Sequence, residues 1–412
     1  MDFLKELAIF ATGDIIPSVE YRYALLNYYG ALIQGAHTPE VDLLVKYHQS
    51  DGNGEFSPLQ RKERLSLSQV VEVDCFSSAV LAYDDIHYDT TTHPCGPVAS
   101  AILGVARKQT VTLLEAAKAL CVGMEVLCRI GVCLFKNTDA SGGWYTTGVV
   151  GAMGAAAAAG RLYGFTVDQM VEAMALASCF SSGSRGSHGS LAGSYIPAIA
   201  ASNGFKAAGL VKNGFTCNKR ALESKDGLMY LIAKNPNRKE ALEDLGTKFI
   251  SQETVCKPYP YGFISFAMID CLKEIPKRSP TPLTIEVSSR CMHLGANAHP
   301  QNNYDGLVSL VYIASRVLEN PENCFKPLKG DFMITDIQKE WMEKITLKED
   351  PALQDNQARV SLNNQTWFCE KASGADFDSQ QIIDKFIHNS GKSRLWIEAF
   401  LELDSMNILD CI

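Results

Sequence analysis

Residues 148–160 read Gly-Val-Val-Gly-Ala-Met-Gly-Ala-Ala-Ala-Ala-Ala-Gly. Alanine has the highest helix propensity of the natural residues, and side chains this small let neighbouring helix backbones approach closely. The tract is shorter than the roughly 20 apolar residues that a membrane-spanning helix needs, and Arg161 follows it directly. We therefore predict a central helix of a tightly packed bundle, and no membrane partner.

The helical pattern extends on both sides of this tract. Apolar residues recur at helical spacing from about residue 66 to residue 231. Thr112 is followed by Glu115, and Thr166 by Gln169, which is the spacing of a capping box at the start of a helix. Helical spacing returns after residue 378. We predict a large all-helical domain over residues 1–256, completed by residues 379–412.

The interval 257–378 has a different pattern. Residues 283–289 and 358–362 alternate apolar and polar side chains, as half-buried strands do. Asn363-Asn364 then supplies a turn before residues 366–369, and this combination predicts a β-hairpin. We predict a smaller α+β domain here, within a fold that is mainly α.

The charge of the chain restricts its partners. Its 412 residues carry a formal net charge of −8, and lysine and arginine are scattered rather than clustered. Such a surface does not neutralise phosphates, so nucleic acid is excluded as a partner. An acidic substrate would need a positive charge confined to its own pocket. Thirteen cysteines lie singly, with no CxxC spacing, which favours a reducing compartment and a cytoplasmic protein.

The densest titratable cluster spans residues 84–96, Asp-Asp-Ile-His-Tyr-Asp-Thr-Thr-Thr-His-Pro-Cys-Gly. A capped helix end would explain its Asp and Thr residues, and an aspartate pair would suit Mg²⁺. The nearest second magnesium motif, Asn303-Tyr-Asp305, lacks the acid expected one turn later, so we predict no metal. The third interpretation is acid–base chemistry, because a histidine flanked by carboxylates can exchange protons with a carbon acid near neutral pH.

Four segments, in order, carry a family resemblance. An aspartate pair precedes His93-Pro94, residues 143–164 hold the Ala-rich tract, residues 201–208 read Ala-Ser-Asn-Gly-Phe-Lys-Ala-Ala, and residues 257–260 read Lys-Pro-Tyr-Pro. Together they resemble the MmgE/PrpD family over nearly the whole chain. The resemblance implies a helical domain with a smaller lid domain, an active site in the cleft between them, and a homodimer. It also implies proton transfer on small di- and tricarboxylic acids without a cofactor.

The positions shared with that family suggest the catalytic groups. The resemblance makes His93 the general base or acid, with Asp84 or Asp85 to orient it or share its proton. It makes Lys257 a holder of a substrate carboxylate. Other positions depart from the family pattern: Ala82 replaces Asp, Tyr145 and Phe266 replace His, Gly193 replaces Lys, and Gly262 replaces Cys.

A Ser- and Gly-rich stretch around Arg185 can compensate for these departures. Arg185 can bind a carboxylate bidentately, and His188, with His87 of the acidic cluster, would complete the substrate-binding set. A surface loop is the alternative for this stretch. Tyr145 would act as a weak acid or pack as a core aromatic. The loss of cationic groups, with Tyr145 and Phe266 as a new aromatic lining, predicts a substrate with fewer carboxylates and more apolar surface than a tricarboxylate.

We therefore predict a cofactor-independent lyase that dehydrates or decarboxylates a small carboxylic acid. An isomerase, an epimerase or a cyclase of the same fold is the alternative among enzymes, and aromatic replacements would suit a cyclase with a larger substrate. The missing cations also fit a catalytically silent paralogue that binds a metabolite. Turnover of the ligand distinguishes the enzymes from the paralogue.

Overall fold

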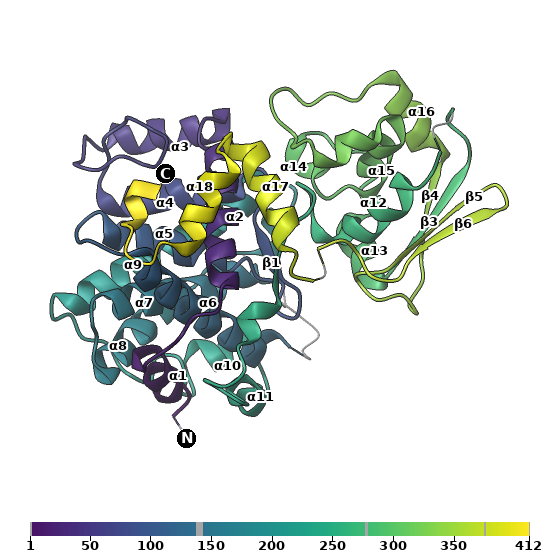
Figure 1. Ribbon diagram of the computed structural model, residues 1–412. Coiled ribbons are helices and arrows are strands. Elements are labelled where there is room, and N and C mark those ends of the chain that lie inside the picture. The colour runs from purple at the N-terminus through teal and green to yellow at the C-terminus, as the bar shows by residue number, and fades with distance from the viewer. Residues whose placement is uncertain (1, 137–142, 277–278, 375, 412) are drawn as a thin grey trace.

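The computed structural model describes residues 2–136, 143–276, 279–374 and 376–411. Within these residues the chain forms eighteen α-helices and six short strands, which confirms the predicted mainly α class. Figure 1 shows a large helical body beside a smaller domain that carries a sheet. The helices of the body are α1 Phe3–Thr12, α2 Glu20–Gly35, α3 Pro39–Ser50, α4 Leu67–Ala79, α5 Cys95–Ala106, α6 Leu113–Phe135, α7 Thr146–Leu162, α8 Val167–Ser178, α9 Leu191–Lys212, α10 Leu228–Ile232, α11 Arg238–Leu242, α17 Ser379–Ser390 and α18 Arg394–Glu402.

Helix α7 is the centre of the helical body. It contains the Ala-rich tract and packs against α5, α6, α8 and α9, so the predicted central helix is confirmed. The approach of α9 is close enough that a Cβ on Gly204 would lie 2.2 Å from the carbonyl oxygen of Ala152. Only glycine permits this contact. The small side chains of α7 thus set how tightly the bundle packs.

Both predicted capping boxes are present at helix starts. At the start of α6, the Thr112 hydroxyl accepts from the Glu115 amide at 3.3 Å, and the Glu115 carboxylate accepts from the Thr112 amide at 2.8 Å. Thr166 and Gln169 make the same pair of contacts at the start of α8. Each box satisfies amide groups that the first helical turn leaves without partners.

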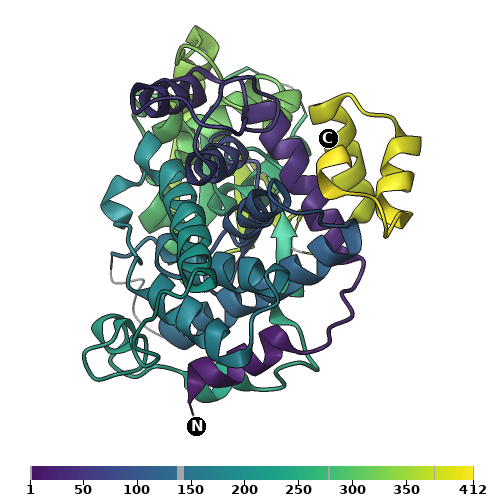
Figure 2. The ribbon, with the colours of Figure 1, turned by 90° about the vertical axis from the view of Figure 1, so that its left-hand side faces the viewer.

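The C-terminal helices pack back on the helical body. Helix α17 lies against α2, and Phe386 on α17 stacks on Trp396 of α18 with ring centroids 5.4 Å apart. Figure 2 shows both helices at the edge of the body beside α2. One buried apolar cluster includes α17, α18 and the N-terminal helices, and a second lies within residues 259–372. The domain limits at 257 and 378 stay a prediction.

The smaller domain is built on a four-stranded mixed sheet in the order β4-β3-β5-β6. Strand β3 is parallel to β4 and antiparallel to β5, and β5 and β6 form the predicted hairpin, with Asn363 at φ 54° in its turn. Sequence alternation did not reveal β4. The strand expected over 283–289 ends at Val287, because Ser288 caps a helix through its hydroxyl. The elements are α12 Phe266–Lys273, β3 Leu283–Val287, α13 Ser289–Gly295, α14 Asn303–Gly306, α15 Leu310–Glu319, α16 Asp336–Lys344, β4 Ile345–Glu349, β5 Ala358–Leu362 and β6 Gln365–Cys369.

A separate two-stranded ribbon joins distant parts of the chain. Strand β1, Asp85–His87, pairs antiparallel with β2, Thr254–Cys256. The ribbon places the acidic cluster beside the segment that leads into the smaller domain. No helix within the described ranges is both long enough and apolar enough to span a bilayer.

Candidate active site

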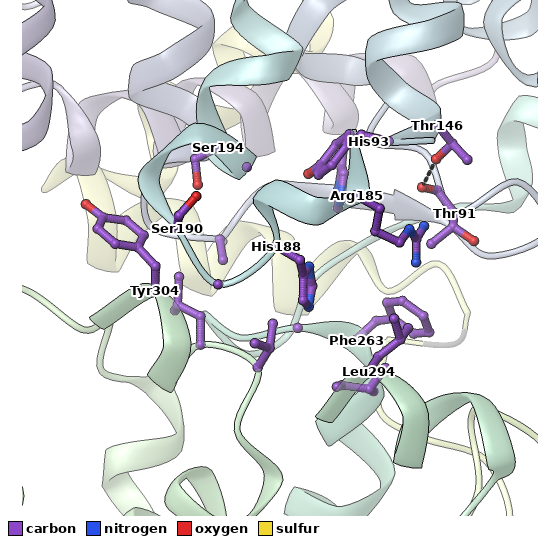
Figure 3. A pocket seen from close by; sticks show the side chains of 18 of the residues that line it. Thr91, His93, Thr146, Arg185, His188, Ser190, Ser194, Phe263, Leu294 and Tyr304 are labelled. Carbon is purple, nitrogen blue, oxygen red and sulfur yellow. Dashed lines mark hydrogen bonds between the residues drawn. The ribbon is translucent and has the colours of Figure 1, made fainter. Parts of the chain in front are cut away.

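A cavity of about 130 Å³ lies between the helical body and the smaller domain. Figure 3 shows Ser190, Ser194 and Tyr304 gathered on one side of it, with Arg185 and Phe263 on another. The smaller domain supplies mostly apolar side chains, and the helical body supplies most of the polar ones. The lining residues include Thr91, His93, Tyr145, Thr146, Arg185, His188, Ser190, Ser194 and Lys257, and, from the smaller domain, Phe263, Ile264, Leu294, Tyr304, Leu307 and Val308.

Three predicted residues form one connected series at this cavity. Lys257 Nζ donates to Asp84 Oδ1 at 2.5 Å, and Asp84 Oδ2 lies 3.1 Å from His93 Nδ1. The side chains of Lys257 and Asp84 are only 5% and 11% exposed, so this ion pair is withdrawn from solvent. The ribbon explains the meeting, because the Lys257 amide donates to the Asp84 carbonyl at 3.1 Å directly beside the β1–β2 pairing.

The series keeps Asp84 ionised. Burial alone would raise the pKa of this carboxyl, but the Lys257 ammonium and His93 hold its pKa well below the ordinary value. Opposite charges within a few ångströms favour the charged form of a carboxylate. Asp84 is therefore a fixed negative charge beside the histidine at any pH near neutrality.

The surroundings of His93 define its tautomer. Its Nδ1 is 2.6 Å from the carbonyl oxygen of Asp85 and 3.1 Å from the carboxylate of Asp84. Both partners are acceptors, so Nδ1 carries the hydrogen and the other ring nitrogen, Nε2, holds a lone pair in the neutral ring. His93 lines the cavity. It therefore has the protonation pattern of a general base.

Asp85 lies beside the series but does not line the cavity. Its Oδ2 accepts from the Cys95 amide at 2.9 Å at the start of α5, while Oδ1 is buried without a hydrogen-bond partner in the described part of the chain. Burial and the neighbouring Asp84 charge raise the pKa of Asp85 to about 6. Of the two aspartates expected to orient His93, Asp84 does so with its carboxylate and Asp85 with its backbone carbonyl.

Tyr145 and Arg185 both reach the cavity, as expected. The rings of Tyr145 and His93 are 6.5 Å apart between centroids. Burial, followed by the charge of Asp84, raises the pKa of Tyr145 far above its ordinary value, so the hydroxyl stays protonated. Arg185 lies in the 3₁₀ turn Arg185–Ser187, and its Nε is buried with no hydrogen-bond partner among the described residues. An unpaired guanidinium in a cavity is suited to a carboxylate.

The two other predicted histidines are placed differently. His188 lines the cavity near Arg185, and burial together with the Arg185 charge lowers its pKa. His87, assigned above to substrate binding, lies outside the cavity and is 1% exposed. Its Nδ1 contacts the Thr90 hydroxyl at 2.8 Å and its Nε2 the carbonyl of Ile250 at 3.2 Å. Both ring nitrogens already have partners, so His87 stabilises the local fold around Thr90 and Ile250 and is not available to a substrate.

The positions that depart from the family pattern mostly face the cavity. Ala82, Gly193 and Gly262 line it, as does Tyr145. Phe266 does not: it is fully buried in the smaller domain, where its ring packs on Tyr259 with centroids 5.7 Å apart. The expected lining by Phe266 is therefore wrong, and Phe263, one helical turn earlier, supplies the aromatic surface.

Sequence reasoning missed a contact across the rim of the cavity. Arg290, from α13 of the smaller domain, donates to the Thr91 hydroxyl of the helical body and to Asp355 at 3.0 Å. Its guanidinium also lies over the ring of Phe263, 5.4 Å from the centroid. Thr91 has a left-handed backbone with φ 53°. No motif marks these residues in the sequence, because the contact joins segments 199 positions apart.

Comparison with known proteins relates the chain to one family. Residues 15–241 match the model of the MmgE/PrpD N-terminal domain. Two cis-aconitate decarboxylases of Aspergillus terreus, one from strain NIH 2624, are 24% identical over 257 residues, covering 56% of this chain and 52% of each relative. The chain thus spans about half the length of the curated relatives it matches.

In the described residues, no group of three or more His, Cys, Asp or Glu side chains is arranged to hold a metal ion.

Proposed function

Because the chain belongs to the MmgE/PrpD family, we propose that it is a lyase that acts on a small carboxylic acid by acid–base chemistry. The observation that carries the proposal is the buried series Lys257, Asp84 and His93, which meets the same cavity as an unpaired Arg185. One part of the cavity can exchange a proton, and another can hold a carboxylate.

In this proposal His93 exchanges the proton with the substrate carbon. The Asp84 carboxylate and the Asp85 carbonyl hold its Nδ1 hydrogen, so Nε2 accepts the proton. The imidazolium that forms is stabilised by Asp84, which stays ionised because of Lys257. Acid–base catalysis of this kind contributes about a hundred- to ten-thousand-fold to a rate.

Two lyase reactions fit these groups. In dehydration, Nε2 takes a proton from the carbon, the C–H electron pair forms the double bond, and the neighbouring hydroxyl leaves as water with the proton returned by protonated His93, while the Tyr145 hydroxyl hydrogen-bonds to the leaving oxygen. In decarboxylation, the bond to a carboxylate breaks, carbon dioxide leaves, and the electron pair takes a proton from protonated His93. Burial raises the pKa of the Tyr145 hydroxyl, so Tyr145 stays a hydrogen-bond donor to the leaving oxygen and does not itself give up the proton. Cis-aconitate decarboxylase, the name of both relatives, supports the second reaction.

The charges at the cavity limit the substrate. Lys257, which we expected to hold a substrate carboxylate, is already paired with Asp84. Arg185 forms no ion pair with a carboxylate of the described chain and takes over that role, with His188 beside it when protonated. The facing wall is apolar and consists of Phe263, Ile264, Leu294, Leu307 and Val308. We infer a mono- or dicarboxylate with an apolar substituent.

The test is turnover of a panel of acids by the purified protein. The panel contains cis-aconitate, 2-methylcitrate, and mono- and dicarboxylates with larger apolar groups, followed by chromatography of the products. The proposal expects turnover of an acid with one or two carboxylates, abolished by His93→Gln. Efficient turnover of either tricarboxylate would contradict the inferred charge limit, while leaving the proposed lyase chemistry in place.

Arg185→Gln tests the assigned carboxylate site. A charge-assisted hydrogen bond is worth about 1.5 to 3 kcal/mol, so the variant should bind the acid roughly ten- to a hundredfold more weakly. Arg220→Gln is the matched control, because Arg220 is an exposed arginine of the same helical body that does not line the cavity. Equal affinity of both variants and the wild type would place the carboxylate elsewhere.

A catalytically silent paralogue is the second candidate. It is favoured by one observation, namely that glycines line the cavity at positions 193 and 262, where the family resemblance implies a lysine and a cysteine. Such a protein would also be stabilised thermally by a bound acid, but it would leave the acid unchanged. Binding of a panel acid without turnover, together with loss of binding in Arg185→Gln, would establish this second function.

A further inference from the structure

Lys385, on the C-terminal helix α17, is buried close to the site but outside its cavity. Its side chain is withdrawn from solvent, with 8% exposure for the residue. The ammonium donates to Asn27 Oδ1 at 2.6 Å, to the Tyr83 carbonyl at 2.8 Å and to the Lys257 carbonyl at 3.0 Å. An ammonium has three donors and no acceptor, so all of its hydrogen-bonding capacity is directed at these three oxygens.

The three acceptors surround the ion pair of the site. Tyr83 directly precedes Asp84 in the chain, and Lys257 is the other partner of the pair. Asn27 completes the arrangement, because its Nδ2 donates to the Asp84 carbonyl at 3.3 Å. The ammonium of Lys385 thus joins α2, the segment that enters β1 and the segment that leaves β2. These segments are separated from Lys385 by 358, 302 and 128 positions.

The chemistry of this contact is unusual for a buried charge. The described residues include no carboxylate that pairs with Lys385 within salt-bridge distance, and burial lowers its pKa to about 8. A buried charge is costly unless hydrogen bonds satisfy it, and here carbonyl and amide oxygens do so. The ring of Tyr83 adds a cation–π contact, with Nζ 3.9 Å from the centroid.

We propose that Lys385 is a positioning residue, which holds the backbones of Tyr83 and Lys257 so that the Lys257 ammonium and the Asp84 carboxylate meet beside His93. The expected effect on turnover rests on the proposed function, whereas the expected effect on the ion pair does not. It gives the C-terminal helices a role at the site, although α17 lies outside the family match at residues 15–241. Lys385 is not among the residues that line the cavity.

The experiment compares Lys385→Met with Phe386→Leu. Phe386 is the next residue on α17, is 1% exposed, and packs on Trp396 of α18, so its variant loosens the helix without removing the ammonium. The first readout is the rate at which acetic anhydride acetylates Lys257 in the folded protein, followed by peptide mass spectrometry. The second is kcat and KM for the acid of the panel that the wild type turns over.

We expect Lys257 to be acetylated faster in Lys385→Met than in the wild type or Phe386→Leu. Loss of a neighbouring positive charge alone would favour the protonated, unreactive amine, so a faster reaction reports a displaced side chain. Turnover should fall on the order of a hundredfold in kcat, the cost of a misplacement of about 1 Å, with KM little changed. Equal acetylation and equal kcat in Lys385→Met and Phe386→Leu would overturn the proposal.

Two further measurements cover a variant that does not fold and a wild type that is inactive. If Lys385→Met does not fold, Asn27→Ala removes one acceptor of Lys385 and one donor to Asp84, and the same comparison with Phe386→Leu applies. If the wild type turns over no acid, the proposed function fails, but the acetylation rates still decide whether Lys385 positions the ion pair.

Discussion

Removing one or both partners of the Lys257–Asp84 pair should give very different losses of stability. The Lys257→Met variant leaves the buried Asp84 carboxylate with His93, 3.1 Å away, as its remaining partner. The Asp84→Asn variant leaves the Lys257 ammonium buried without a carboxylate. Replacing both residues removes the charges together. Breaking a buried pair costs about 3 to 5 kcal/mol, whereas replacing both partners is often nearly neutral.

The expected losses in the free energy of unfolding are large because both side chains are buried, with exposures of 5% for Lys257 and 11% for Asp84. We expect Lys257→Met near the lower end of that range, about 3 kcal/mol, because the Nδ1 hydrogen of His93 still contacts the Asp84 carboxylate, and Asp84→Asn near the upper end, about 5 kcal/mol. The double variant should lie within about 2 kcal/mol of the wild type. The losses are therefore strongly non-additive, as expected for residues in direct contact.

The assay is urea unfolding at neutral pH, followed by far-UV circular dichroism, for the wild type, both single variants and the double variant. Lys339→Met is the matched control, because Lys339 pairs with Asp336 at 2.9 Å with side chains 60% and 96% exposed. An exposed pair of this kind is worth about 0 to 1 kcal/mol. Single-variant losses as small as that of the control, or a double-variant loss equal to the sum of the two, would show that Lys257 and Asp84 are not a buried, mutually dependent pair.

Three other outcomes are expected. Burial and the Asp84 charge raise the pKa of Asp85 from 3.8 to about 6, so the folded state binds this proton more tightly than the unfolded state does. The free energy of unfolding should therefore fall as pH rises from about 4 to about 6. The Asp85→Asn variant should lose this pH dependence in urea titrations, and its free energy of unfolding at pH 7 should be roughly 3 kcal/mol higher than that of the wild type. Gly204→Ala should lower stability by about 1 to 3 kcal/mol because its Cβ would meet the Ala152 carbonyl, whereas Gly209→Ala on the same helix, with open space around it, should be neutral or stabilising in thermal unfolding. Activity should survive dialysis against a chelator, because the sequence predicts no metal at the acidic cluster. A loss that added metal restores would contradict that prediction.

The sequence predicted several residues of the candidate site but not how they contact one another. The acidic cluster and the Lys-Pro-Tyr-Pro segment indicated Asp84, His93 and Lys257, and these three meet. Their roles could not be read from the sequence. Lys257 and Asp84 are 173 positions apart, and no local pattern shows that the lysine pairs with the aspartate while Arg185 stays unpaired at the cavity.

The features that can be predicted from the sequence alone are those that local physical chemistry controls. The capping boxes at Thr112 and Thr166, the Ala-rich helix and the hairpin turn at Asn363 are each defined within a few residues, so propensity and periodicity predict them. The change from helical to alternating spacing near residue 257 is local as well. Because these signals depend on neighbours along the chain, the mainly α class follows from them without any knowledge of packing.

The assembly of the candidate site, in contrast, follows from tertiary contacts. The pairing of β1 with β2, two strands of three residues each, is too short to leave a pattern, yet it turns the carboxylate of Asp85 away and brings Asp84 to Lys257. The burial of His87 and the reach of Lys385 from the far end of the chain depend equally on contacts between distant segments. Such contacts form because packing of the whole helical body brings these segments together, and that packing is not encoded in any one stretch of residues.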